Sequence, residues 1–111
     1  MDEAFSVLWS RSALDDLEQI LEYVSSRDGH GAAEDLGTRL MLKIESLSSH
    51  PKRCRIVPEL ADAGIRGYRE LIESPYRVFF RIHGEAVHLL GILDGRRDLE
   101  QILIARALFE R

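Results

Sequence analysis

The stretch that decides the fold is residues 67–97, GYRELIESPYRVFFRIHGEAVHLLGILDGRR. It contains three runs rich in Val, Ile, Leu, Tyr and Phe, side chains that favour β-strands. The runs are residues 68–72, 76–82 and 86–93, and the turns between them are Glu73-Ser74-Pro75 and His83-Gly84-Glu85. Proline gives no N–H to a strand ladder, and a short link with glycine is typical of a hairpin. The stretch therefore predicts a three-stranded antiparallel meander.

The middle strand of this meander has two different faces, because side chains alternate along a strand. One set of side chains is apolar and is expected to face the core: Tyr76, Val78, Phe80 and Ile82. The other set carries cations, a histidine and one aromatic ring: Arg77, Phe79, Arg81 and His83. We expect this second face to carry the function.

The rest of the chain predicts one strand and three helices. Residues 5–9 form a short apolar run of strand length, expected at the edge of the meander. A first helix begins at Ser10 or Ser12 and stops at Asp28-Gly29-His30-Gly31, with an apolar stripe of Ala13, Leu14, Leu17, Ile20, Leu21 and Val24. The remaining expected elements are a helix over residues 32–48, a loop over 51–66 with solvated Lys52, Arg53 and Arg55, and a helix over 99–108 capped by Asp98. Within the loop, Val57-Pro58-Glu59-Leu60 is expected to be an irregular or single-turn segment. The fold class is α+β in the order β-α-α-β-β-β-α, with a helical hairpin on one sheet face.

Composition narrows the function. The 111 residues are 45% hydrophobic and 31% charged, which predicts a single globular domain over residues 1–111. Cys54 is the only cysteine, and the four histidines have no metal-ligand spacing, so no disulfide, metal or cofactor is expected. No apolar run approaches the roughly 18 residues of a membrane span, and the acidic N-terminus lacks a signal-peptide pattern. We expect a cytoplasmic protein that does not enter membranes.

Charge is divided unevenly along the chain. The formal net charge is −4, from 15 Lys and Arg against 19 Asp and Glu. Residues 11–45 hold four cations and eight anions, whereas residues 50–111 hold eleven cations and nine anions. The pattern suits a chain that meets a charged partner on one side. It argues against a nucleic-acid-binding protein, because such domains are usually strongly basic.

Short motifs follow one another in order along nearly the whole chain. They are Val7-Leu8-Trp9-Ser10, Asp16-Leu17, Val57-Pro58-Glu59-Leu60, Tyr68-Arg69-Glu70-Leu71-Ile72, Pro75-Tyr76-Arg77-Val78, Asp94-Gly95-Arg96-Arg97-Asp98 and Ile102-Leu103. This ordered set resembles the RelE/ParE toxin superfamily of type II toxin–antitoxin modules. The resemblance implies a small β-sheet toxin, encoded in a plasmid-stabilisation type of module, that causes growth arrest. It also implies a cognate antitoxin that wraps around the toxin in a hetero-oligomer.

The superfamily contains two chemistries. RelE-type members cut mRNA on the ribosome, which needs cations for the phosphate and a general acid and base. The resemblance implies Arg69, Arg77 and Arg81 as phosphate clamps, with His83 or His88 as acid or base. However, the ribonucleases tend to end in a catalytic His-Tyr or Tyr, whereas this chain has residues 94–98 followed by a helix. That ending resembles the ParE branch, which poisons DNA gyrase by binding and without catalysis.

The ParE branch is the favoured interpretation, and the two alternatives are a ribosome-dependent mRNA endonuclease and an inactive fold that only binds antitoxin. Residues expected to bind the target are Arg96, Arg97, Leu103 and Arg106. Arg96 and Arg97 are expected to be well exposed, because they form a charged pair after Gly95 at a strand end. Residues expected to bind the antitoxin, in a groove between the helical hairpin and the sheet, are Leu14, Leu17, Leu21, Arg69, Tyr76, Arg77 and Arg81. The antitoxin tail is expected to supply an amphipathic helix and carboxylates. Structural ion pairs with nearby glutamates are the alternative for Arg69 and Arg77.

Overall fold

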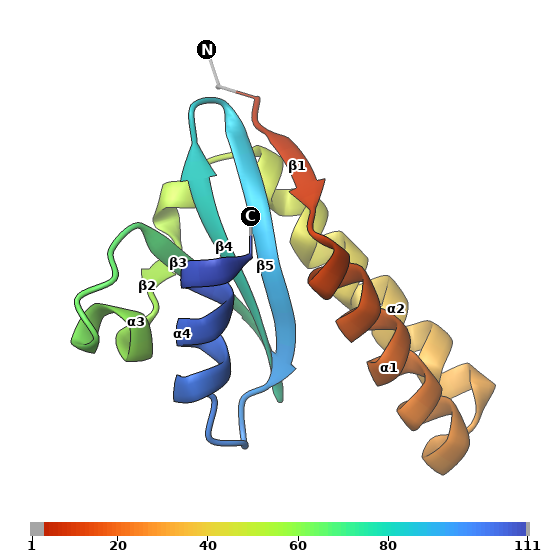
Figure 1. The fold of residues 1–111 in the computed structure, drawn as a ribbon. Helices are drawn as coiled ribbons and strands as arrows, with labels where there is room; N and C mark the ends of the chain where they lie inside the picture. The colour runs from red at the N-terminus through yellow and green to blue at the C-terminus, as the bar shows by residue number, and fades with distance from the viewer. Residues whose placement is uncertain (1–3, 111) are drawn as a thin grey trace.

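The computed structural model describes residues 4–110, and its elements follow the predicted order with two additions (Figure 1). The strands are β1 (Ser6–Trp9), β2 (Arg55–Ile56), β3 (Tyr68–Glu73), β4 (Tyr76–His83) and β5 (Ala86–Asp94). The helices are α1 (Arg11–Asp28), α2 (His30–Glu45), α3 (Pro58–Asp62) and α4 (Glu100–Phe109), with 3₁₀ turns at Ser46–Ser48 and Pro51–Arg53. The α+β class is confirmed.

One mixed sheet, in the order β1-β5-β4-β3-β2, forms the centre of the molecule. Strands β3, β4 and β5 are the antiparallel meander predicted from the sequence. At one edge β1 pairs with β5 in parallel, so the sheet is not purely antiparallel. At the other edge the predicted loop is wrong at Arg55 and Ile56, which pair with β3. Pro58 then opens the short helix α3, which agrees with the single-turn alternative for this segment. Proline suits the first turn of a helix, where its missing N–H would have no partner.

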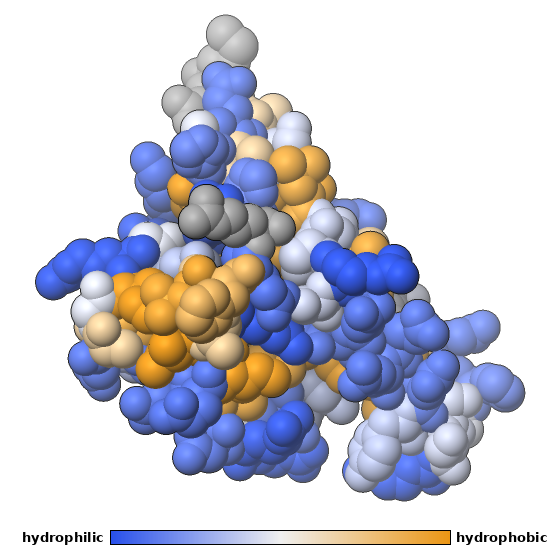
Figure 2. All heavy atoms as spheres, viewed as in Figure 1, coloured by the Kyte–Doolittle hydropathy of each residue, from blue (hydrophilic) through white to orange (hydrophobic). Residues whose placement is uncertain are grey.

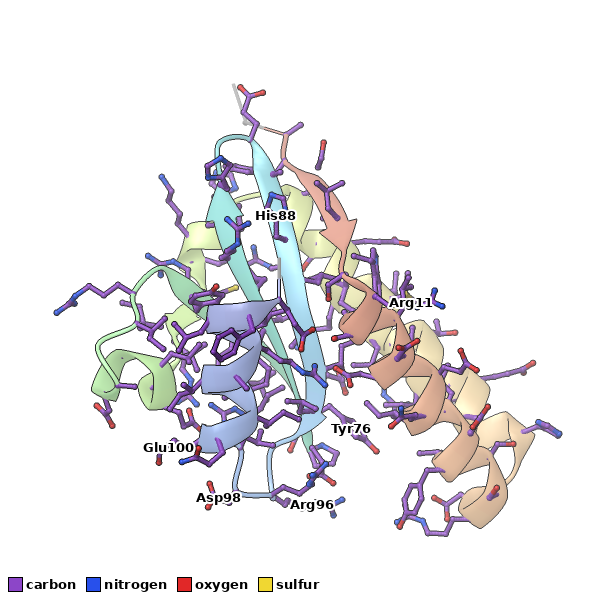
Figure 3. All side chains as sticks on the ribbon, viewed as in Figure 1. Arg11, Tyr76, His88, Arg96, Asp98 and Glu100 are labelled. Carbon is purple, nitrogen blue, oxygen red and sulfur yellow. The ribbon has the colours of Figure 1, made fainter. Side chains whose placement is uncertain are left out.

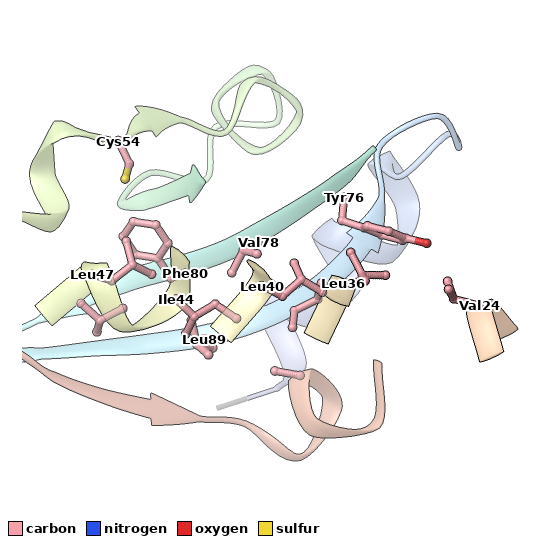
Figure 4. Packing of buried hydrophobic residues seen from close by; sticks show 13 residues of the cluster. Val24, Leu36, Leu40, Ile44, Leu47, Cys54, Tyr76, Val78, Phe80 and Leu89 are labelled. Carbon is pink, nitrogen blue, oxygen red and sulfur yellow. The ribbon is translucent and has the colours of Figure 1, made fainter. Parts of the chain in front are cut away.

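The helical hairpin of α1 and α2 covers one face of the sheet. The Ser10 side chain caps α1 by accepting a hydrogen bond of 3.0 Å from the N–H of Ala13. Gly29, with φ of 96°, is the only residue between the two helices. The core beneath the hairpin includes Leu40, Ile44, Val78 and Phe80 (Figure 4). The predicted core face of β4 is therefore confirmed.

Leu14 departs from the predicted apolar stripe of α1. It is 46% exposed, whereas Ala13 is fully buried and Leu17 packs partly against the core. The polar residue Asp16 takes a buried place on the same helix. The helical periodicity was right, but the face that turns inward is centred on Ala13, Ile20 and Val24.

A second core lies on the opposite face, beneath α3 and α4. Phe79 is fully buried there with Leu90, Leu93, Leu99 and Leu103. The β4–β5 register shifts between Phe79 and Phe80, which pair with Gly91 and Leu89, so Leu90 is the extra residue of a bulge. The face of β4 that is expected to carry the function is therefore buried over the part that α4 covers. Within residues 4–110, no helix is long and apolar enough to cross a membrane.

Candidate functional site

Arg106 and Asp16 join α4 and α1 to the part of β5 that β1 does not reach. Strand β1 pairs with residues 86–89 of β5 and then ends. Beyond it, the Ile92 N–H donates to Asp16 Oδ2 at 2.9 Å, and Arg106 Nη1 donates to the Leu90 carbonyl at 3.4 Å. Arg106 also donates to both oxygens of Asp16, at 2.5 and 2.9 Å. The pair therefore satisfies backbone groups that a longer β1 would have bonded.

This arrangement contradicts two of the predicted target contacts. The Arg106 side chain is only 12% exposed, and its pKa is raised chiefly by its hydrogen bonds to Asp16. Leu103 is fully buried in the second core. Helical periodicity put both residues on one face, but that face turns toward the sheet and not toward a partner. Neither residue is available on the surface of this structure.

Arg77 lies at the centre of an ion-pair network on the α3 side of the sheet. It donates to both oxygens of Glu59, at 2.6 and 2.8 Å, and to Glu70, whose side chain is fully buried. Arg55 donates to the same Glu70 at 2.7 Å, and the Arg77 guanidinium stacks 5.0 Å from the Phe79 ring centre. Hydrogen bonding to Arg77 holds the pKa of Glu59 below its usual value.

The five residues predicted for the ribonuclease alternative do not come together. The Arg77 side chain is 12% exposed and bound to two carboxylates, so it cannot also clamp a scissile phosphate. Arg69 pairs in register with Phe80 and donates to the Cys54 carbonyl at 2.6 Å, which places it on the hairpin side of the sheet. The structural ion-pair alternative is therefore confirmed for Arg77, and the three-arginine clamp is wrong.

Arg81, His83 and His88 do lie near one another. Figure 3 shows His88 on the part of the sheet beyond the end of α4. Arg81 pairs in register with His88, and the rings of His83 and His88 have their centres 6.3 Å apart. The pKa of His88 is lowered, first by burial and then by the charges of Arg81 and His83. Of the five residues predicted for the ribonuclease alternative, these three are the ones that lie close together.

The turn after β5 carries the remaining predicted target contacts. Arg96 is 67% exposed and is paired with Asp94 at 2.7 Å, and Arg97 is also exposed. The hydrogen bond from Arg96 lowers the pKa of Asp94 to about 2. Gly95 is required here, because an added Cβ would lie 2.8 Å from the Arg77 side chain and 3.0 Å from the Pro75 carbonyl. The predicted exposure of this turn is confirmed.

The predicted antitoxin groove between hairpin and sheet is absent, because that space is the main core. Instead, α1 and α2 line a shallow groove of about 1050 Å³ on their own surface. Its lining includes Leu21, Met41 and Leu42, with Glu22, Glu34 and Glu45 around them. Of the residues predicted to bind the antitoxin, Leu21 is the only one in this lining; Tyr76 is buried in the core.

Other chemistry is not assembled in residues 4–110. No group of three His, Cys, Asp or Glu side chains there could hold a metal ion. Cys54 is a buried free thiol, and burial raises its pKa, which makes it a poor nucleophile.

The comparisons with known proteins agree with this geometry. Residues 7–99 match the family described as ParE toxin of type II toxin-antitoxin system, parDE. The chain belongs to the ParE toxin family. It is 30% identical over 93 residues to Toxin ParE3 of Caulobacter vibrioides, an alignment that covers 84% of this chain and 89% of that protein.

A solved structure shares the fold of this ParE-type toxin. A chain of the chromosomal ParDE TA system from P. aeruginosa matches with a TM-score of 0.69 and 22% identity, covering 83% of this chain and 97% of that one. The resemblance found in the sequence motifs, with the ParE branch favoured over the RelE branch, is confirmed.

Sequence reasoning missed the partners of the arginines. Glu59 and Glu70 hold Arg77, and Asp16 holds Arg106 across 90 positions of sequence. Asp16 did carry a signal, because it is a charged residue close to the apolar stripe of an amphipathic helix. A carboxylate at such a place needs a buried partner.

Proposed function

We propose that this ParE-type toxin inhibits DNA gyrase by binding it and that a cognate antitoxin neutralises the toxin. The observation that supports this mechanism is that arginines of the sheet already bind groups within the protein. Arg77 is held by Glu59 and Glu70, and Arg69 lies on the opposite face of the sheet. A phosphate-cleaving site needs free cations around the reacting group, and two of the three candidates are already committed. Binding requires only an exposed surface.

The exposed turn of Arg96 and Arg97 is the proposed contact with the target. Both arginines project from a rigid base, because Gly95 packs on the Arg77 stem and the Arg77 head is fixed by two carboxylates. Arginines at the centre of an interface often contribute a large part of the binding energy. Deleting residues 99–111 would not test this contact, because Leu99 and Leu103 belong to the core.

The experiment adds purified toxin to gyrase and supercoiled plasmid and, in parallel, to a translating ribosome extract. We expect linear plasmid after protease treatment, and at least about tenfold less of it with an Arg96→Ser/Arg97→Ser variant. The matched control is Arg11→Ser/Arg39→Ser, which removes the same charge from side chains that are 87% and 55% exposed. An equal decrease in linear plasmid with both variants would show that only the net charge of the toxin matters.

The ribonuclease alternative makes the opposite prediction in the same experiment. Arg81, His83 and His88 are the observation that favours it, since they share one open face. Codon-positioned mRNA cuts with no linear plasmid would overturn the gyrase proposal. A folded toxin that is inactive in both assays but binds its antitoxin would support the interaction-module alternative.

For neutralisation, the groove on the helical hairpin is the proposed antitoxin site. Its apolar lining suits the apolar face of an amphipathic helix, and its carboxylates suit Lys or Arg at the edges of that helix. The sequence predicted carboxylates on the antitoxin, whereas this groove suits cations on the antitoxin. The difference arises because Arg69, Arg77 and Arg81, which were expected in the groove, lie elsewhere. Residues 11–45, which include both helices, carry twice as many anions as cations.

Two leucines on the hairpin provide a matched test of the groove. Leu42 lines it and is 63% exposed, whereas Leu14 lies outside it and is 46% exposed. We expect Leu42→Asp to weaken antitoxin binding at least about tenfold and Leu14→Asp to leave it nearly unchanged, measured by calorimetry with the protein of the neighbouring reading frame. The reverse order would move the site away from the groove. Separate elution of the two native proteins at micromolar concentration would reject neutralisation by binding.

A further inference from the structure

Helix α4 covers only part of its face of the sheet, and the residue types change where it stops. Beneath the helix the face is apolar, with Phe79, Leu90 and Leu93 in the second core. Past its end the register places Leu8, His88, Arg81 and Tyr68 in one row across β1, β5, β4 and β3. His83 lies two residues beyond Arg81 on the same face. In Figure 3 His88 lies past the C-terminal end of α4.

A hollow lies at this end of α4 between the helix and the sheet. Its volume is about 490 Å³, and its lining includes Arg66, Arg81, His83 and Leu108. A smaller hollow of about 90 Å³ adjoins it, shares Tyr68 and Arg81 with it, and reaches His88. The site is therefore a concave surface with four nitrogen-bearing side chains around it.

Among the described residues, the two arginines of this hollow lack the carboxylate partners that several other arginines of the protein have. Arg77, Arg96 and Arg106 each hold a carboxylate within 3 Å. Among residues 4–110, neither Arg66 nor Arg81 has a carboxylate within 4 Å.

Glu110 is the one acidic residue in the lining of the two hollows, and it forms no ion pair with either arginine. It accepts a hydrogen bond from the Ser12 hydroxyl and lies 3.9 Å from Arg106 Nε. Tyr68 is likewise engaged, since its hydroxyl donates to the Ala107 carbonyl at 3.3 Å. Two positive charges thus face the hollow against one carboxylate that already has partners.

We propose that this hollow binds a phosphate group, held by the Arg81 and Arg66 guanidinium groups with His88 and His83 beside them. Guanidinium groups bind phosphate oxygens through paired hydrogen bonds, so unpaired arginines in a concave site suit this anion. The same chemistry could come from free phosphate or from the backbone of a nucleic acid. The proposal is independent of gyrase as the target, since the hollow lies at the C-terminal end of α4, whereas the Arg96–Arg97 turn precedes its N-terminal end.

Binding should strengthen as the pH falls. The charged and titratable groups that face His88 are Arg81 and His83 from β4, Tyr68 from β3 and Glu110 after α4; Leu8 of β1 is apolar. Burial lowers the pKa of His88, and the charges of Arg81 and His83 add a repulsion toward the proton, so the ring is mostly uncharged at neutral pH. A bound anion offsets that repulsion, so protonation and anion binding favour each other.

The experiment follows the ring protons of His83 and His88 by NMR in the full chain. The probes are inorganic phosphate, sulfate and a thymidine hexanucleotide, each titrated at pH 7.5 and 6.0. We expect both rings to shift with millimolar or tighter affinity, and sulfate, whose charge is constant over this range, to bind at least about threefold more tightly at pH 6.0. We also expect the pKa of His88 to rise when the anion is bound.

Variants distinguish specific binding of the anion in the hollow from general attraction of the anion to positive charge. Arg81→Gln should weaken binding at least about tenfold, Arg81→Lys should restore part of it, and Arg11→Gln, with the same loss of charge, should leave it unchanged. Tighter binding of the hexanucleotide than of phosphate would assign the group to a nucleic-acid backbone, and the reverse to free phosphate. The proposal is overturned if no probe shifts the rings below 10 mM, or if folded Arg81→Gln and Arg66→Gln variants bind like the native chain.

Discussion

Gly91→Ala adds one methyl group to β5 and tests the Asp16–Arg106 pair. A Cβ built on Gly91 would overlap Arg106 Nη1 and lie 3.0 Å from Asp16 Oδ2. The backbone itself does not require glycine, since the φ of Gly91 is not positive. Elsewhere in a strand, the change would stabilise by about 0.5–1 kcal/mol. Here the methyl group and the guanidinium compete for the same space.

The expected cost follows from what the methyl group displaces. Removing one partner of a buried ion pair costs about 3–5 kcal/mol, and Asp16 and Arg106 are 9% and 12% exposed. Asp16 keeps the Ile92 N–H as a partner, and a displaced Arg106 can turn toward Glu110, so part of that cost is recovered. We expect Gly91→Ala to lower the free energy of unfolding by about 2–4 kcal/mol. For a domain of this size the midpoint temperature should fall by about 8–16 °C.

A double-mutant cycle, with the free energy of each variant measured by urea unfolding, tests this expected cost. Arg106→Met alone should cost about 3–5 kcal/mol. In the Arg106→Met background, Gly91→Ala should be neutral or slightly stabilising, because the group it displaces is gone. The control is Gly31→Ala, whose Cβ meets nothing within 4 Å and which should not destabilise. A neutral Gly91→Ala, or costs that add in the double variant, would refute the reasoning.

Three further predictions concern the other network, the turn and the thiol. Glu59→Gln should lower the free energy of unfolding by roughly 1 kcal/mol at pH 7. Because the pKa of Glu59 is held below its usual 4.5, this contribution is present above pH 4.5 and is lost as the pH falls below it. The urea midpoints of the two proteins should therefore converge toward pH 3, and a constant gap would contradict this. Gly95→Ala should destabilise by about 1–3 kcal/mol, since its Cβ would press on the Arg77 stem and the Pro75 carbonyl, and an unchanged thermal midpoint would show that the turn simply shifts. Cys54 should react with a thiol reagent at pH 8 far more slowly than in urea, and equal rates would mean that the buried site opens readily.

Local patterns in the sequence were sufficient for the meander and the helical hairpin. Alternation in residues 76–82 and the glycine at position 29 are local signals, and the structure follows both. The short strand β2 was missed, and α3 was predicted only as an irregular or single-turn segment, because two paired residues and one helical turn leave almost no periodic pattern. Their positions depend instead on pairing with β3 and on the bond between Glu59 and Arg77.

The candidate site was predictable only in part for a related reason. Exposure of the Arg96–Arg97 turn followed from a glycine and two charges after a strand. The fates of Arg77, Arg81 and Arg106 could not be told apart from sequence, since each is an arginine on an apolar element. They differ in whether the fold brings a carboxylate next to them. The carboxylates of Arg77 are Glu70 and Glu59, which lie 7 and 18 positions away, and that of Arg106 is Asp16, which lies 90 positions away.

The length of α4 decides how much of the sheet can meet another molecule. Rows of side chains on one face of a strand are about 6.6 Å apart, and one helical turn advances 5.4 Å. A little more than one extra turn would therefore carry the helix across the row of Arg81 and His88 and bury it. Insertions or deletions of about four or five residues in this helix would thus change this part of the sheet between a closed core and an open surface, while the strands below stay unchanged. Relatives that differ in the length of this segment would differ in ligand access before any residue of the sheet had changed.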